Sequence, residues 1–146
     1  MPRLYRAQPD SSTIQDPRVF VRVFAPPGLL SPTVDFYRAL TSAPVDMDME
    51  WPEAQLHLVA VGAFLIIELD PSAHEQAAAT TTTVLVAGLD DAVAEQVRRG
   101  AEIVQARWEA PVGAGALLRH PDGLLVEYVE HRPSPHDVAQ PGPQFS

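Results

Sequence analysis

Hydrophobic and polar positions predict the same order of elements in each half of the chain. In the first half, alternation over residues 18–25 predicts a strand, and apolar residues three apart predict a helix over Ser31–Ala43, with Ser31 as its N-cap. Alternation resumes over residues 45–51, and the apolar runs within residues 55–69 predict a hairpin. The first half is therefore expected to fold as a strand, a helix and three further strands.

The second half repeats this order with little sequence identity. A strand is predicted over residues 81–86, a helix over Asp90–Arg99 and a strand over residues 102–108. Two apolar segments within residues 116–129 flank the turn sequence His-Pro-Asp-Gly at 120–123, which predicts a closing hairpin. The repeated order argues for an internal duplication, with one module over residues 18–70 and another over residues 80–131.

Neither end of the chain shows a periodic pattern. Residues 1–17 are polar and are expected to form a flexible arm, and the proline-rich residues 132–146 are expected to form a tail. No apolar run is long enough to span a bilayer, and the first residues lack the apolar segment of a signal peptide. We expect a cytoplasmic protein that has no membrane partner.

Composition and charge narrow the classes of function. The 146 residues are 46% hydrophobic and 20% charged, which is ordinary for one globular domain with a core. The formal charge of −9 argues against nucleic acid as a partner, because phosphate binding depends on clustered basic residues. The absence of cysteine excludes disulfides, thiolate metal sites and thiol nucleophiles.

Two glutamates stand in apolar strands and need an explanation. Glu127 shares one strand face with Leu125 and Val129, and Glu68 occupies a similar place in the first half. A carboxylate there costs free energy unless it is paired, hydrogen-bonded or coordinated. Glu127 is thus a candidate acid or base, and the alternative is a structural hydrogen-bonding role for both residues. Arg22 is expected to neutralise one of them or to bind a ligand anion.

Strand phase predicts a set of residues that face inward. They could line a ligand cavity with aromatic walls and a few polar contacts, or they could form ordinary core. The candidates are Phe20, Arg22, Phe24, Met47, Met49, Trp51, Glu68, Thr81, Thr83, Trp108 and Glu127. The acidic residues that alternate with Met47 and Met49, among them Asp48, are expected to face outward. His57 could face the cavity, whereas His131 near the tail is expected to be solvated.

The chain resembles the vicinal oxygen chelate superfamily, which includes glyoxalases, bleomycin resistance proteins and extradiol dioxygenases. The resemblance is carried by Val19–Ala25, by TVDFYRAL at residues 33–40 and by HPDGLLVEYVE at residues 120–130. It implies an α+β fold in which two βαβββ modules, related by a pseudo-two-fold axis, curl their sheets around a central cavity. The resemblance is also compatible with a homodimer.

Metal-dependent members of that superfamily take ligands from the first and last strand of each module. The last-strand positions correspond to Glu68 and Glu127. The first-strand position of module one falls on Phe20, or on Arg18 or Arg22 if a loop insertion shifts it, and that of module two falls on Thr81 or Thr83. None of these is a good ligand for a divalent ion. We therefore expect no metal and no cofactor; a metal, if present, would be held by Glu68 and Glu127.

Two functions remain open from the sequence. The first is metal-independent binding of a small apolar or aromatic molecule in the cavity, as antibiotic resistance proteins of this superfamily do by sequestration. The alternative is an enzyme of isomerase, lyase, cyclase or dioxygenase type that uses Glu127 as acid or base, or that uses a metal ion held by Glu68 and Glu127.

Overall fold

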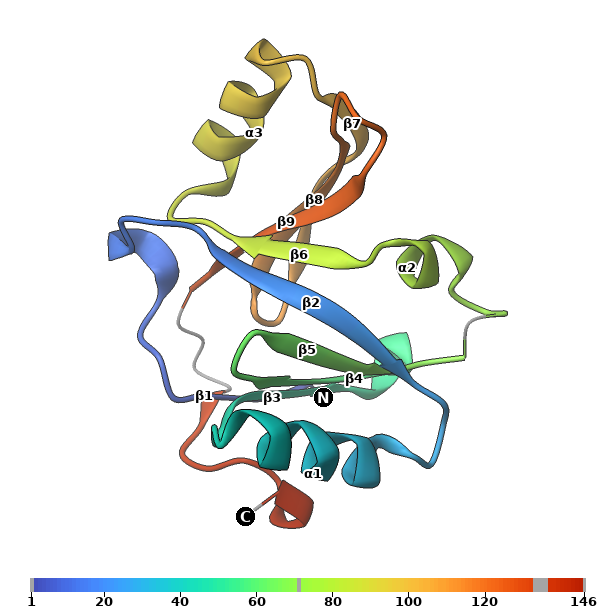
Figure 1. Ribbon diagram of the computed structural model, residues 1–146. Coiled ribbons are helices and arrows are strands. Elements are labelled where there is room, and N and C mark those ends of the chain that lie inside the picture. Colours follow the sequence, from blue (N-terminus) through green and yellow to red (C-terminus); the bar gives the residue numbers. More distant parts are fainter. Residues whose placement is uncertain (1, 71, 133–136, 146) are drawn as a thin grey trace.

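The chain folds as an α+β protein built on one strongly curled sheet (Figure 1). The computed structural model describes residues 2–70, 72–132 and 137–145. Within these residues the sheet has ten strands in the order β10-β1-β3-β4-β5-β2-β6-β9-β8-β7, accompanied by three α-helices. The predicted fold class is confirmed.

The first predicted module forms one half of this sheet. Its elements are β2 (Arg18–Ala25), α1 (Leu30–Thr41), β3 (Val45–Trp51), β4 (Leu56–Val61) and β5 (Phe64–Glu68). Strands β3, β4 and β5 form an antiparallel meander, and β5 returns to pair in parallel with β2. The strand bounds follow the alternation in the sequence closely, because one face of each strand is buried.

The second half repeats this arrangement after a short connecting helix, α2 (Glu75–Ala79). Its elements are β6 (Thr82–Leu85), α3 (Leu89–Arg98), β7 (Glu102–Ala110), β8 (Gly113–Arg119) and β9 (Leu125–His131). Strand β6 pairs in parallel with β9, as β2 does with β5. The order of elements is therefore as expected, and the pseudo-two-fold relation between the modules stays a prediction.

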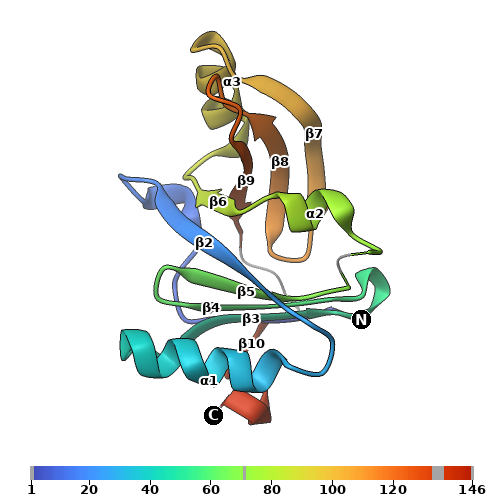
Figure 2. The same cartoon turned by 45° about the vertical axis from the view of Figure 1, so that its right-hand side comes forward.

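The two halves join through the first strand of each. Strands β2 and β6 pair antiparallel in the middle of the sheet, and the β3–β5 and β7–β9 layers curl away from them (Figure 2). Helices α1 and α3 lie at opposite ends of the molecule, each on the outer face of its own half (Figures 1 and 2). The inner faces of both halves are left to face one another across a shared interior.

Both long helices begin one residue before the predicted position. Helix α1 starts at Leu30 without a side-chain cap, so Ser31 is not its N-cap. Helix α3 starts at Leu89, whose backbone N–H donates to the Glu130 carboxylate on β9 over 2.8 Å. A carboxylate at this end of a helix complements the free N–H groups and the helix dipole. The group that caps the N-terminus of α3 therefore comes from a distant strand.

The two ends of the chain are not a loose arm and tail in the part the structure describes. Strand β1 (Arg3–Arg6) pairs antiparallel with β3, and a short 3-10 helix follows over Ser11–Thr13. Strand β10 (Asp137–Val138) pairs in parallel with β1, and Pro143–Phe145 form another 3-10 turn. Leu4 and Phe145 are fully buried. Residues 133–136 of the predicted tail lie outside the described residues.

A buried carboxylate connects these end segments to the sheet. Asp48, predicted to face outward, is completely buried because β1 and the C-terminal segment cover that face of β3. Its carboxylate contacts His57 Nε2 at 2.6 Å, the Gly142 N–H at 2.7 Å and Arg3 Nη1 at 3.3 Å. His57 consequently faces Asp48 and not the interior. We call these four residues the Asp48 cluster.

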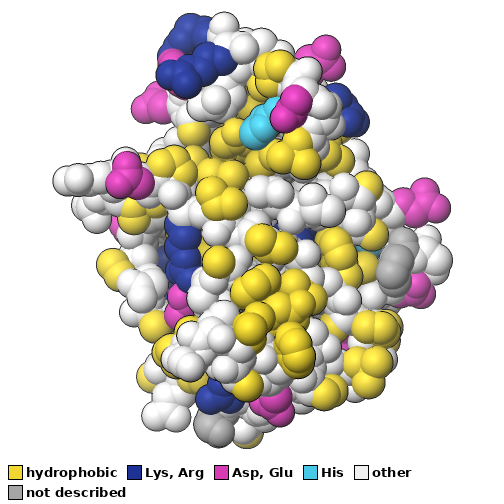
Figure 3. Space-filling model, in the orientation of Figure 1, with side chains coloured by type: hydrophobic (Ala, Val, Ile, Leu, Met, Phe, Trp, Pro, Cys, Tyr) yellow, Lys and Arg dark blue, Asp and Glu magenta, His cyan; other side chains and the backbone are white. Residues whose placement is uncertain are grey.

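Hydrophobic residues fill three regions of the molecule. One cluster lies under α1, another under α3, and the third lies on the concave side between the two halves. Figure 3 shows that hydrophobic side chains also gather on the surface in front of α1 and β2. These elements carry four large exposed apolar residues, Val19, Val21, Phe36 and Leu40. No helix in the described ranges is long and apolar enough to cross a bilayer.

Candidate functional site

A narrow apolar cavity of about 110 Å³ lies on the concave side of the sheet, between the two halves. We call it the trough. Both halves contribute residues to its wall, which is mainly aliphatic and aromatic with three polar side chains. The lining residues are Phe20, Met47, Met49, Trp51, Leu56, Leu58, Leu65, Thr83, Trp108, Ala110, Val112, Ala114, Gly115, Glu127, Val129 and His131.

Strand register places a row of three residues across the centre of the trough. Phe20 on β2 lies opposite Thr83 on β6, and Thr83 lies beside Glu127 on β9. Laterally paired residues project from the same face of a sheet, so all three side chains face the interior. The junction between the two modules thus positions one apolar and two polar groups side by side.

A compact polar group forms one end of this row. Arg22 Nη1 lies 3.1 Å from both Glu127 Oε1 and the Thr83 hydroxyl, and that hydroxyl donates to Glu127 over 3.1 Å. Arg22 also donates to the Ala77 carbonyl at 3.3 Å. The side chains of Arg22 and Glu127 are 5% and 23% exposed, so the ion pair compensates for much of the charge burial. Of the roles considered for Arg22, the structure shows the salt bridge to Glu127.

Both tryptophans of the chain line the trough, and one depends on a neighbouring glycine. A Cβ atom at Gly115 on β8 would lie 2.7 Å from Cζ2 of the Trp108 indole. A real Cβ essentially never approaches another heavy atom this closely, so only glycine lets the indole lie flat against β8. The absence of a side chain at Gly115 therefore allows Trp108 to occupy its position in the wall of the trough.

Four predicted site residues do not line the trough, and one of them, Arg22, is connected to it only through its contacts with Thr83 and Glu127. Phe24 packs against the inner cluster, with the Arg22 guanidinium 5.7 Å above its ring. Thr81 is exposed and precedes β6, where its carbonyl accepts the Arg22 N–H. Glu68 lies on the α1 side of β5, together with Ile66, and accepts the Gly28 N–H over 3.0 Å. Its face of the strand is the outer one.

This placement argues against a metal held by the two glutamates. Glu127 lines the trough, whereas Glu68 lines a separate surface pocket beside His57 and Asp70. A divalent ion needs several ligands that converge within about 2–2.6 Å. Within the described ranges, no group of three or more histidine and acidic side chains could hold such an ion. The donor set that the superfamily uses does not fit these residues.

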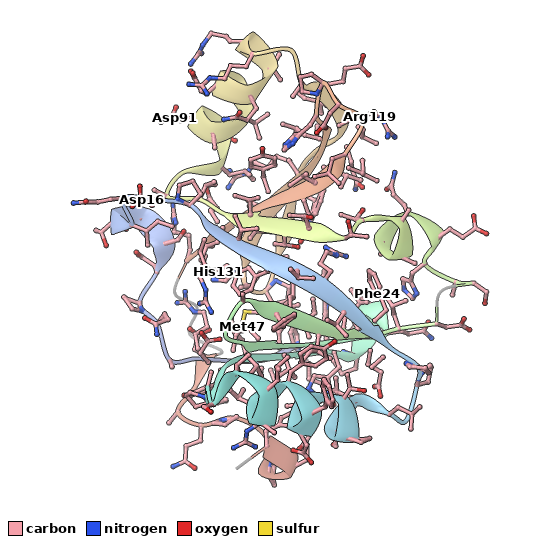
Figure 4. The ribbon with its side chains drawn as sticks, viewed as in Figure 1. Asp16, Phe24, Met47, Asp91, Arg119 and His131 are labelled. Atoms are coloured by element: carbon pink, nitrogen blue, oxygen red, sulfur yellow. The ribbon has the colours of Figure 1, made fainter. Side chains whose placement is uncertain are left out.

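His131 is a functional candidate that the sequence reasoning placed in solvent. It lies at the end of β9, lines the trough and is adjacent to Met47 (Figure 4). Burial lowers the pKa of His131 to about 3, assisted by the positive charges of Arg6, Arg18 and Arg132. The imidazole is therefore neutral at physiological pH. A signal existed in the sequence, because His131 follows Glu127 by four residues and shares its strand face.

Comparison with known proteins rests on the fold. No protein-family model matches the chain, and no curated protein matches it in sequence. A hypothetical protein from Methanosarcina mazei matches with a TM-score of 0.66 and 29% identity, over 78% of this chain and 91% of that one. Methylmalonyl-CoA epimerase from Mycobacterium tuberculosis matches with a TM-score of 0.53 and 15% identity, over 80% and 86%.

A variant of the Streptomyces coelicolor methylmalonyl-CoA epimerase, in complex with 2-nitronate-propionyl-CoA, matches similarly. Its TM-score is 0.52 at 19% identity, over 77% of this chain and 94% of the epimerase. At this identity the match shows a shared fold. The curled sheet is shared with the epimerases and is consistent with the fold expected from the resemblance to the vicinal oxygen chelate superfamily.

Proposed function

We propose that this protein binds a small apolar or aromatic molecule in the trough, without a metal ion. The observation that supports the proposal is the wall itself, in which Trp51, Trp108 and Phe20 surround a cavity with one ion-paired carboxylate. Each favourable ring contact adds ~0.5–1.5 kcal/mol beyond the burial of area. Met47 and Met49 add flexible contacts that adapt to irregular ligands.

The size of the trough favours a small ring system. Its 110 Å³ is below the ~300–1,000 Å³ usual for sites that enclose drug-sized ligands. A single substituted aromatic ring is therefore a suitable occupant, and a longer ligand would have to extend beyond the trough.

Tryptophan emission gives a direct test, because the chain has only two tryptophans and both line the trough. 4-Nitrobenzamide, a neutral aromatic quencher, should reduce the emission in a saturable way. Trp51→Ala or Trp108→Ala should weaken its binding several-fold, whereas Phe36→Ala, at an exposed ring on α1, should not. Linear, non-saturating quenching that is equal in all proteins would contradict the proposal.

One observation favours a second function, catalysis by Glu127. Glu127 is the carboxylate that lines the trough among the described residues, and the epimerases with the same fold are enzymes. A general base here would remove a proton from a carbon next to a carbonyl and return it to that carbon. Small acyl thioesters and keto acids incubated with the protein in D₂O would then exchange that hydrogen, as NMR can measure.

Glu127→Gln separates the two functions. Binding alone predicts that the variant retains affinity for 4-nitrobenzamide and that neither protein catalyses exchange. Acid–base catalysis predicts exchange by the wild type and a loss of ~10²-fold or more in the variant, with binding retained.

A further inference from the structure

A second cavity, of about 320 Å³, opens directly beside the trough. We call it the arm pocket, because residues of the N-terminal segment form most of its wall. Phe20, Met47 and His131 line both cavities, so the two are separated only by side chains that they share. A ligand whose ring occupied the trough could therefore place a substituent in the arm pocket.

The wall of the arm pocket contains an arginine with unused hydrogen-bonding capacity. The Arg6 side chain is only 6% exposed, and its Nη2 lies 3.4 Å from the Asp137 carboxylate. Its Nε and Nη1 atoms are buried and have no hydrogen-bond partner among the described residues. Buried donors of a charged group usually have hydrogen-bond partners, and a buried donor without one costs free energy. A turn of the guanidinium toward the pocket would let a bound acceptor satisfy them.

A second arginine in this wall is already occupied. Arg18 donates to Asp46 at 2.8 Å and to the Gly62 carbonyl at 2.6 Å, and its guanidinium lies 4.4 Å above the Phe20 ring. It contributes positive charge and holds the ring that both cavities share. The low pKa of His131 is consistent with this charge distribution, because Arg6, Arg18 and Arg132 all disfavour its protonation.

Acidic residues near the pocket limit the charge that a ligand can carry. Asp46, Asp10 and Asp16 also line the wall. Asp46 is paired with Arg18, Asp10 accepts hydrogen bonds from Ser12, and Asp16 is exposed. One buried Asp46 oxygen has no donor in the part of the chain that the structure describes. These carboxylates would repel a second negative charge, so a singly charged anion fits better than a phosphate dianion. The planar fork of an arginine matches a carboxylate.

We propose that the trough and the arm pocket together bind one small aromatic or apolar carboxylic acid, with its ring in the trough and its carboxylate against Arg6. This inference rests on the proposed binding function and names the class of ligand. Arg6 then serves as a specificity-determining residue supplied by a segment that looks featureless in the sequence.

Three probes of the same ring test the inference by quenching of tryptophan emission. They are 4-nitrobenzoate, the neutral 4-nitrobenzamide and the dianionic 4-nitrophenyl phosphate. The wild type should bind the benzoate about tenfold or more tightly than the amide, because a hydrogen bond to a charged group is stronger than a neutral one. The phosphate should bind no more tightly than the benzoate.

Two variants locate the effect at Arg6. Arg6→Gln should reduce the preference for the benzoate over the amide to about twofold or less, mainly by weakening the binding of the benzoate. Arg119→Gln makes the same change of charge at an exposed position on β8 and should leave the preference intact. If Arg6→Gln does not fold, Arg6→Lys should keep part of the preference, because it retains the charge but loses the fork.

The outcomes distinguish this inference from the proposed function. If neither the benzoate nor the amide binds, both fail. If the amide binds and the benzoate binds no more tightly, the trough is a binding site and the carboxylate assignment is wrong. The assignment is equally wrong if the phosphate binds more tightly than the benzoate, or if Arg119→Gln abolishes the preference as Arg6→Gln does.

Discussion

The Asp48 cluster should contribute a large part of the stability, and Asp48→Asn measures it. The substitution keeps the size of the side chain and removes its charge. In the wild type the carboxylate accepts hydrogen bonds from His57, Gly142 and Arg3 with no exposure to water. An amide has one oxygen, so it cannot accept all three bonds, and those that remain lose the negative charge of the acceptor.

The magnitude follows from the difference between charged and neutral hydrogen bonds. Bonds to charged groups contribute ~1.5–3 kcal/mol each and neutral bonds about 1 kcal/mol, and breaking a buried pair costs ~3–5 kcal/mol. We expect Asp48→Asn to lower the free energy of unfolding by about 2–4 kcal/mol. For a chain of this length, that corresponds to a fall in Tm of roughly 5–15 °C.

The pH dependence gives the prediction a sign. Burial by itself would raise the pKa of Asp48, but the hydrogen bonds from His57 and Gly142 and the charge of Arg3 hold it below its ordinary value of 3.8. The folded state thus takes up this proton at lower pH than the unfolded state. The stabilisation is fully present above the unfolded pKa and is lost as pH falls through the folded one. The gap between wild type and variant should therefore narrow below about pH 4.

Urea unfolding at pH 7 and at several lower pH values is the assay, with Asp35→Asn on the exposed side of α1 as the control. The control should change stability by less than about 1 kcal/mol. A wild type and an Asp48→Asn variant that unfold within about 0.5 kcal/mol of one another at pH 7 would show that the cluster stabilises nothing. A gap that widens on acidification would refute the assigned sign.

Three further predictions concern the trough. Gly115→Ala should displace the Trp108 indole, shift the tryptophan emission and weaken 4-nitrobenzamide binding about tenfold, because overpacking costs ~1–3 kcal/mol. The control Gly88→Ala, where an added Cβ meets open space, should change neither the emission nor the binding. The His131 ring should show no titration by NMR between pH 5 and 8, because its pKa is about 3. An unfolded histidine protonates near pH 6.5, so the free energy of unfolding should fall below that pH by at most ~1.4 kcal/mol per pH unit. His131→Gln should reduce this slope. A titration midpoint of the His131 ring near pH 6.5 would contradict the assignment. Purified protein should hold no stoichiometric divalent metal by elemental analysis. A content of about one metal per chain that is lost in Glu127→Gln would contradict this prediction.

The order of elements could be predicted from sequence because strand alternation and helical periodicity are local properties. Strand phase also placed Phe20, Thr83 and Glu127 on one face. Phase separates the two faces of a strand but does not tell which one is inside, and Glu68 shows the consequence. Glu68 shares a strand face with Ile66, but that face packs under α1 and the opposite face lines the trough.

Features that depend on contacts between residues far apart in the chain could not be predicted from the sequence. Strand β1 has only four residues, and its partners Met49 and Asp137 are far along the chain. Nothing near Asp48 in the sequence indicates that Gly142 would cover it. The arm pocket was missed for the same reason, because its wall exists only after the N-terminal segment has paired with β3.

The pairing of β1 with β10 has a consequence for the order in which the molecule opens. These strands form one edge of the sheet, closed by a ladder of two residue pairs and bridged by Arg6 and Asp137. Closing contacts between residues so distant in sequence has a high entropic cost, and edge segments with few buried residues exchange their amide hydrogens first. Amide exchange at this edge should thus proceed by local opening, well before the exchange of β2 and β6. Strand β1 stays paired with β3 over four residue pairs, so opening of the β1–β10 ladder alone would free Arg6 from Asp137 and leave its guanidinium available to the carboxylate ligand proposed above.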